Sequence, residues 1–292
     1  MREMRYTDTE LEQLLNRLVA STRTPRGRFA AANSYKRLEK RLPGKRSFPL
    51  VRWIGATAAM VALCVAGWFV TDYAQADSSQ TIYTQAEVRT ISLPDGTEVT
   101  LNHFSSLTYP KRFQQKERTV SLCGEAYFEV RKDTKHPFVV QTDAVDIRVL
   151  GTQFNVKAYA NTPEIKTTLF EGSVAVSDKS QSERIVLRPN ESAIYNKVEG
   201  SLTLVPSNDV SDDIAWQNGI LIFNNLPLIE IAYQLSNTFG IPIRITDKAL
   251  QEYRITARFE QKEGLIPILR LLQHAKSFNY IEQNKEIILS AP

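Results

Sequence analysis

The spacing of apolar residues along the 292-residue chain changes from helical, to continuous, to alternating, and finally to a mixture of helical and alternating segments. In residues 1–50, a capping box from Thr7 to Glu10 precedes apolar residues three and four positions apart, which predicts an amphipathic helix. We define its leucine stripe as Leu11, Leu14, Leu15 and Leu18, with Val19 on the same face.

A second helix is predicted over residues 29–42, and its apolar face comprises Ala31, Tyr35, Leu38 and Leu42. Two helices of this length bury little surface against each other, and short isolated helices are marginally stable in water. Their apolar faces therefore favour a helical region that binds a partner protein. The alternatives are that the helices lie on a membrane surface or pack on each other.

Residues 53–70 form a run of eighteen residues without a charge. As a helix, this run would be about 27 Å long, close to the hydrocarbon thickness of a bilayer. It predicts one transmembrane helix at residues 51–72. The residues that would anchor this helix at the membrane interfaces are Arg52, Trp53 and Trp68. A buried core helix and a cleaved signal peptide are the alternatives, the second because residues 74–76 (AQA) resemble a cleavage site.

The distribution of charge predicts the orientation of this helix. Residues 1–52 carry a net charge of +8, whereas the whole chain carries only +4. By the positive-inside rule, residues 1–50 would be cytoplasmic and the body periplasmic, in a single-pass inner-membrane protein. A basic head can also indicate nucleic-acid binding, but its position beside the apolar run fits anionic lipid better. No direct nucleic-acid partner is therefore expected.

After a linker at residues 73–82, apolar and polar residues alternate through residues 83–205, which predicts an all-β domain. The alternation continues through Gly124, which predicts a bulge or a close backbone approach at this glycine. At Gly151 and Thr152 the alternation slips by one residue, so the chain needs a bulge or a corner there. The pattern fits either a sandwich or a flattened solenoid.

Beyond a linker at residues 206–218, segments in the order β-α-β-β-α-β predict a compact α+β module at residues 219–292. Its first helix is expected to follow Pro227 and to end at Gly240, with a buried face formed by Leu228, Ile231, Ala232 and Leu235. Modules of this kind usually offer a sheet edge or a helix face to a partner. The predicted fold class is thus a multidomain membrane protein with a helical head, one transmembrane helix, an all-β periplasmic domain and this module.

Residues typical of catalytic sites do not form recognisable motifs. The three histidines, His103, His136 and His274, lack the spacing of metal ligands, and no phosphate loop or nucleophile elbow is present. Glu125 and Glu129 share one strand face, which suggests either paired carboxylates or, more ordinarily, solvated or hydrogen-bonded groups at a sheet edge. The sequence predicts no conventional enzyme, no metal and no cofactor.

Four segments carry a specific pattern, at residues 93–113, 118–130, 136–142 and 149–159. Together they resemble the FecR family of anti-sigma regulators. The module at residues 219–289 resembles the secretin/TonB short N-terminal fold that closes many Bacteroidetes-type members. The resemblance covers residues 83–289, and residues 1–50 carry no strong motif of the family.

The resemblance implies a transmembrane signal transducer. The signalling domain of a TonB-dependent outer-membrane transporter would contact the C-terminal module, and the chain would release or activate an extracytoplasmic-function sigma factor held by the leucine stripe. The alternative is a membrane-anchored binding or scaffold module of the envelope that has no sigma partner.

Some family members are thought to cleave themselves at the bond that corresponds to Gly151–Thr152. The Thr152 hydroxyl would attack the preceding carbonyl in an N→O acyl shift, if the backbone there is strained. The alternative is a bulge glycine followed by a strand threonine, which needs no chemistry.

Overall fold

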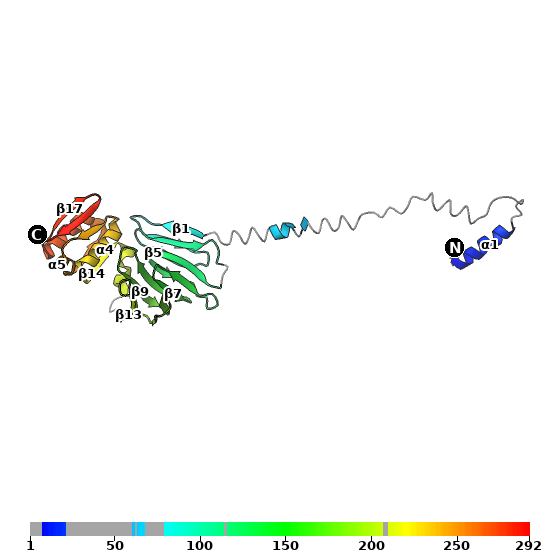
Figure 1. The fold of residues 1–292 in the computed structure, drawn as a ribbon, viewed down its shortest axis with the longest axis horizontal. Helices are drawn as coiled ribbons and strands as arrows, with labels where there is room; N and C mark the ends of the chain where they lie inside the picture. The colour runs from blue at the N-terminus through cyan, green and yellow to red at the C-terminus, as the bar shows by residue number, and fades with distance from the viewer. Residues whose placement is uncertain (1–7, 22–59, 62, 68–78, 114–115, 207–209) are drawn as a thin grey trace. The chain divides into compact units, whose positions relative to one another are not determined.

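The structure, a computed structural model, describes residues 8–21, 60–61, 63–67, 79–113, 116–206 and 210–292 (Figure 1). The chain divides into two compact units, Met1–Ala66 and Gly67–Pro292. In the first unit, α1 spans Asp8–Ser21, which confirms the amphipathic helix predicted from the leucine spacing. The second predicted helix, at residues 29–42, lies outside the described residues.

The prediction of a transmembrane helix is wrong. Among the described residues, no helix is both long and apolar enough to cross a bilayer. Within the apolar run, the described helical residues are 60, 61 and 63–67. The predicted membrane fold class and single-pass inner-membrane localisation are contradicted for the same reason. Hydropathy measures composition, and an uncharged composition does not by itself make one helix of sufficient length. The three predicted anchors, Arg52, Trp53 and Trp68, lie outside the described residues.

Thirteen strands form one hydrogen-bonded sheet in the described part of residues 79–206. They are β1 (Ser79–Tyr83), β2 (Arg89–Ser92), β3 (Glu98–Leu101), β4 (Ser106–Pro110), β5 (Arg118–Glu129), β6 (Phe138–Gln141), β7 (Val145–Val149), β8 (Gln153–Ala158), β9 (Glu164–Glu171), β10 (Val174–Asp178), β11 (Arg184–Leu187), β12 (Glu191–Asn196) and β13 (Ser201–Pro206). The path of the sheet is β11-β10-β7-β6-β5-β8-β9-β12-β13, with β1 and β4 joined to the first part of β5 and β2 and β3 to its second part.

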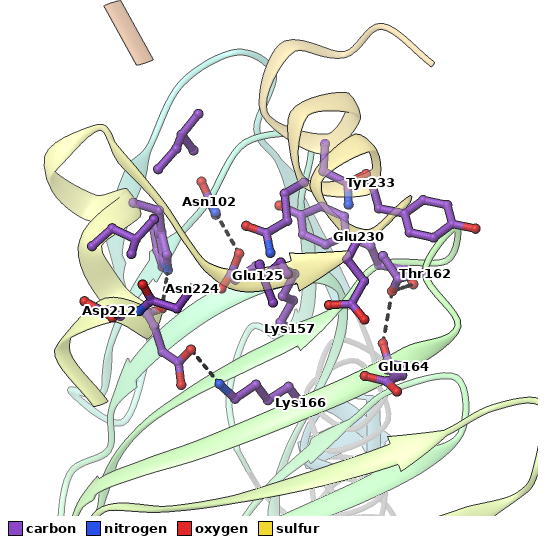
Figure 2. A pocket seen from close by; sticks show the side chains of 18 of the residues that line it. Asn102, Glu125, Lys157, Thr162, Glu164, Lys166, Asp212, Asn224, Glu230 and Tyr233 are labelled. Atoms are coloured by element: carbon purple, nitrogen blue, oxygen red, sulfur yellow. Dashed lines mark hydrogen bonds and ion pairs between the residues drawn. The ribbon is translucent and has the colours of Figure 1, made fainter. Parts of the chain in front are cut away.

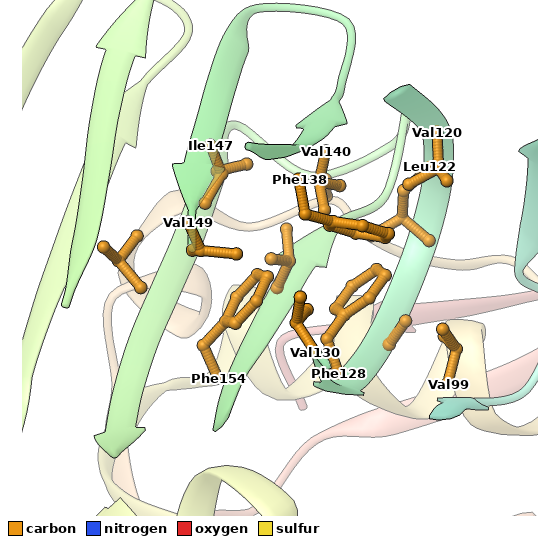
Figure 3. Packing of buried hydrophobic residues seen from close by; sticks show 14 of the residues in the cluster. Val99, Val120, Leu122, Phe128, Val130, Phe138, Val140, Ile147, Val149 and Phe154 are labelled. Atoms are coloured by element: carbon orange, nitrogen blue, oxygen red, sulfur yellow. The ribbon is translucent and has the colours of Figure 1, made fainter. Parts of the chain in front are cut away.

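The long strand β5 belongs to two halves of this sheet. Its residues up to Cys123 pair with β4 and β6, and its residues from Gly124 onward pair with β3 and β8. Side chains from both halves meet in one hydrophobic core, as Figure 3 shows. At its centre the rings of Phe128 and Phe154 stack with centroids 5.0 Å apart, and Phe138 lies 6.2 Å from Phe128. The alternating pattern therefore produces a curled sheet closed around a single core.

Gly124 is the point at which β5 passes from one half to the other. It has φ +113°, and a Cβ atom there would lie 2.6 Å from Ser105 Cα, closer than real Cβ contacts. Only glycine fits, because the backbone of the β3–β4 connection crosses directly over this position. The predicted close approach is confirmed.

The predicted parity slip corresponds to a corner. β7 pairs with β6 and β10 in the first half of the sheet, whereas β8 pairs with β5 and β9 in the second half. Residues 150–152 connect the two strands, and Leu150, which continues the even-numbered pattern, is exposed. The parity changes at this point because the chain leaves the first half of the sheet and enters the second half.

The C-terminal module has its own core. Its elements are β14 (Ile220–Pro227), α4 (Leu228–Phe239), β15 (Ile243–Ile245), α5 (Lys248–Gln251), β16 (Arg254–Glu260), η2 (Gln261–Glu263), α6 (Leu265–Ala275), β17 (Asn279–Gln283) and β18 (Glu286–Ser290). β14 pairs antiparallel with β16, and β18 lies between β15 and β17. The helix predicted after Pro227 is confirmed as α4, with its apolar face buried and Gly240 as its left-handed C-cap. The short helix α5 has no counterpart in the predicted order.

A 3₁₀ helix, η1 (Val210–Asn218), precedes the module where the sequence pattern indicates a linker. Its Trp216 is buried. Asp213 accepts hydrogen bonds from Lys166 Nζ at 2.7 Å and from Thr168 Oγ1 at 2.6 Å. The segment is thus fixed on β9 by an ion pair and a hydroxyl contact rather than extended as a tether.

Candidate interaction surfaces and the interdomain cavity

The leucine stripe lies along one face of α1. Leu11, Leu14, Leu15 and Leu18 expose between 46% and 62% of their surface. Residues three and four apart project from the same side of a helix, so these side chains form a continuous apolar face. Burial of one leucine stabilises a complex by about 1.5–3 kcal/mol, so a partner groove that covers this face gains several such contributions. The face suits a helix-in-groove contact.

Strand β17, red in Figure 1, lies at one edge of the three-stranded sheet in the module. Among the described strands it pairs only with β18. Ile281, at its centre, exposes 56% of its surface. An edge strand presents backbone donors and acceptors on its outer side, and it can therefore pair with a strand from another protein.

The β domain and the module contact each other through polar side chains. Gln261 Nε2 lies 2.8 Å from His103 Nε2, and Asn161 Nδ2 donates to Asn237 Oδ1 at 2.9 Å. His103 Nδ1 is 2.6 Å from Asn102 Oδ1, so Nδ1 carries the proton and Nε2 accepts from Gln261. Burial lowers the pKa of His103, which favours this neutral form.

A cavity of about 520 Å³ lies between the second half of the sheet and the module. Its walls come from β5, β8, β9, β12 and β13 on one side and from η1, β14 and α4 on the other. Figure 2 shows Glu125, Lys157 and Glu230 close together in it. Cavities of this volume are typical of small-molecule sites.

Glu125 is a buried carboxylate in this wall. Its Oε2 accepts from Asn102 Nδ2 at 2.8 Å, and its Oε1 accepts from Asn155 Nδ2 at 2.9 Å. Burial raises the pKa of Glu125, while Lys157 and the two amides oppose this effect. Glu129 is exposed whereas Glu125 is buried, so the structure does not support the interpretation of these residues as paired carboxylates. The hydrogen-bonded alternative is confirmed, although the residue lies in a central strand and not at a sheet edge.

Comparison with known proteins is consistent with this architecture. The chain is similar to two crystal structures of a candidate anti-sigma factor from Parabacteroides distasonis. One, at 2.50 Å, is 29% identical with a TM-score of 0.67, and the match covers 74% of this chain and 100% of that one. The other, at 1.65 Å, is 30% identical with a TM-score of 0.66, and the match covers 72% of this chain and 98% of that one.

The profile of the FecR protein family matches residues 80–175, and that of the FecR C-terminal region matches residues 220–289. The chain belongs to the FecR family of anti-sigma factors. None of the curated proteins matches it.

The bond at which some FecR-family proteins are thought to cleave themselves lies in the corner between β7 and β8. A Cβ atom at Gly151 would lie 2.6 Å from Lys132 Cα, so a side chain is excluded there by close packing. Thr152 is buried, and its Oγ1 donates to the carbonyl of Ser173 at 3.1 Å. A carbonyl oxygen is too weak a base to take up the hydroxyl proton. These contacts favour a structural role for both residues.

We expect the wild-type chain to run as one 33.1 kDa band, and Thr152→Val to leave that band unchanged. Valine keeps the shape of threonine but removes the donor to Ser173, which should lower the free energy of unfolding by about 1–2 kcal/mol. Denaturant unfolding and denaturing gels measure the two effects. Thr152→Ser, which keeps the hydroxyl, is the control. A fragment that begins at residue 152 in the wild type and disappears in Thr152→Val would contradict this expectation.

Glu125→Gln is expected to stabilise the fold at neutral pH by about 1 kcal/mol, because it removes a charge from a buried site. The unpaired Oδ1 of Asn155 can accept from the new amide if the Asn155 side chain turns over. Burial raises the pKa of Glu125 above its usual 4.5, so the contribution of this group to stability is full below pH 4.5 and is lost as pH rises through the folded-state value. The advantage of the variant in thermal unfolding should therefore grow as the pH rises above 4.5.

Glu129→Gln, exposed on the same strand, is the control for this measurement. An advantage of Glu125→Gln that did not change with pH would show that ionisation of this carboxyl is not its source.

The interdomain contacts were not predicted from the sequence. His103 is a scattered histidine in the sequence, and Asn102, Asn161 and Asn237 carry no motif. The segment from Asn102 to Ser106, polar except for Phe104, interrupts two alternating strands and is the one local signal of a loop with a specific role. Among the described residues, no group of His, Cys, Asp and Glu could hold a metal ion.

Proposed function

We propose that this FecR-family protein binds an extracytoplasmic-function sigma factor through the leucine stripe of α1. The exposed apolar face is the observation that carries the proposal. Membership of the family supplies the class of partner, since the matched region is that of anti-sigma factors. The sigma factor would cover Leu11, Leu14, Leu15 and Leu18 with an apolar groove.

We further propose that the C-terminal module receives the signal, from the signalling domain of a TonB-dependent transporter. The edge strand β17, with Ile281 exposed at its centre, supports this part of the proposal. A strand of the transporter domain would pair with β17, and Ile281 would pack against that domain. The chain then connects a contact at the module to the sigma factor at α1.

One pull-down experiment tests both contacts, with the full-length chain as bait and a purified sigma factor and transporter signalling domain as separate prey. Deletion of residues 1–50 should abolish sigma binding and leave transporter binding unchanged. Ile281→Lys should give the opposite result, because a charge on the edge strand opposes pairing.

Leu271→Lys is the control for Ile281→Lys, since Leu271 is similarly exposed but lies on α6. Unchanged sigma binding after the deletion would contradict the first proposal and leave a scaffold without a sigma partner as the better interpretation. Equal effects of the two lysine variants would contradict the second.

A further inference from the structure

The interdomain cavity carries more negative than positive charge. Three of its acidic residues have partners, since Asp213 pairs with Lys166 at 2.7 Å, Asp212 accepts from Asn224, and Glu125 accepts from Asn102 and Asn155. Two further carboxylates, those of Glu164 and Glu230, line the same space.

Lys157 is the cation that Glu125 and Glu230 share, since its charge opposes the rise in pKa of both carboxyl groups. Among the described residues that line the cavity, the cations are Lys157 and the already paired Lys166. Figure 2 shows Lys157 between Glu125 and Glu230. Burial, together with repulsion from Glu164, raises the pKa of Glu230, and the charges of Lys157, Arg254 and Lys166 oppose this rise. The lining holds five carboxylates, those of Glu125, Glu164, Asp212, Asp213 and Glu230, against the two lysines, so a further cation would be stabilised there.

Asn237, on α4, provides an independent sign of a ligand. Its side chain lines the cavity, its surface is more than nine-tenths buried, and its Nδ2 has no hydrogen-bond partner. The other end of the amide is occupied by Asn161 at 2.9 Å. If both amides were turned over, the free end would be the oxygen instead of the nitrogen. A ligand hydroxyl, which both donates and accepts, satisfies either arrangement.

The remaining walls suit an organic molecule rather than a metal ion. Trp216 and Tyr233 contribute aromatic surface, and Ile194 and Leu226 contribute aliphatic surface. Aromatic rings favour both sugar rings and organic cations. No cluster of metal-ligating residues is found among the described residues.

We propose that the interdomain cavity binds a small organic cation that carries a hydroxyl group, the chemical class of the amino sugars. The ammonium group would lie between Glu164 and Glu230, and a hydroxyl would bond Asn237. Because η1 and α4 line the cavity opposite β8 and β9, the bound molecule would contact both the module and the β domain. Binding would therefore stabilise the contact between the module and the β domain. Neither the proposed binding of the sigma factor nor that of the transporter requires such a ligand.

The test uses the full-length chain and four probes in calorimetry and thermal unfolding at pH 7. Glucosamine and ethanolamine carry both an ammonium and a hydroxyl group, glucose carries only hydroxyls, and ethylammonium carries only the charge. We expect glucosamine or ethanolamine to bind saturably, at least tenfold more tightly than glucose or ethylammonium, and to raise Tm by about 3 °C near saturation. Binding of neither amino alcohol, or equal binding of all four probes, would overturn the proposal.

Two variants connect binding to the cavity. Glu230→Gln removes one carboxylate and Asn237→Ala removes the free amide, and each should weaken binding of the tighter amino alcohol at least tenfold. Glu252→Gln, exposed on the same module, should bind it as the wild type does. If Asn237→Ala fails to fold, Glu230→Gln alone decides the result. Undiminished binding by a folded Glu230→Gln would show that the probe binds elsewhere and would overturn the proposed site.

Discussion

Replacement of both Leu14 and Leu18 by glutamate is expected to weaken sigma-factor binding at least a hundredfold. Both side chains belong to the leucine stripe, and both are about half exposed on α1. Each buried leucine contributes about 1.5–3 kcal/mol, so the loss of two removes about 3–6 kcal/mol. Each 1.4 kcal/mol of lost binding free energy weakens the affinity tenfold. The cost of burying the two new carboxylates adds to the loss of apolar contacts. Titration calorimetry of the full chain with the sigma factor measures the change.

The control is Gln13→Glu with Asn16→Glu, which adds the same charge on the opposite face of α1. Glutamate is a good helix former, so neither pair of changes breaks the helix. A loss of less than fivefold is expected for the control. Similar losses in the two double variants would show that charge on α1, and not the apolar stripe, determines binding.

Gly124→Ala is expected to lower the free energy of unfolding by about 3–5 kcal/mol, a large part of the stability of an ordinary domain. The new Cβ would lie 2.3 Å from Ser105 Oγ and 2.6 Å from Ser105 Cα. Ser105 cannot easily move, because its amide donates to Thr84 Oγ1 and its hydroxyl accepts from the amide of Glu125. The backbone at position 124, with φ +113°, adds strain for any residue other than glycine. Denaturant unfolding measures the loss.

Gly200→Ala separates the two causes of this loss. Gly200 has φ +69°, but the nearest atom to its Cβ would be Tyr195 Oη at 4.0 Å. The left-handed backbone alone should cost about 1 kcal/mol there. If both variants lost the same amount, the close approach of Ser105 would not be the reason for the glycine at 124.

Much of the local structure could be predicted because it depends on neighbours in the sequence. Leucines three and four apart define α1, and the same spacing with Pro227 and Gly240 at the ends defines α4. The slip of parity at Gly151 indicated a corner, because side chains on a strand alternate strictly between two faces. The resemblance to the FecR family also came from segments quoted directly from the sequence, and the comparisons confirm it.

The candidate surfaces could be predicted only in part. The leucine stripe was visible, since an apolar face needs only the helical period. The membrane-spanning helix was wrongly predicted, because composition gives the solvent that a segment prefers but not the length of helix that it forms. The cavity left no sequence signal, since its lining residues come from positions scattered between Asn102 and Thr238.

The sequence by itself determined most of the strands, the helices α1, α4 and α6, and the family, because helical period, strand alternation and turn residues act over a few positions. Only the tertiary structure decided that the sheet closes around one core, that Gly124 lies under Ser105, and that Glu125 is buried. It also decided that Glu125 and Glu230, a hundred residues apart, share Lys157. Contacts of this kind depend on which surfaces the chain brings together, and burial then sets the charge state of the groups enclosed between them.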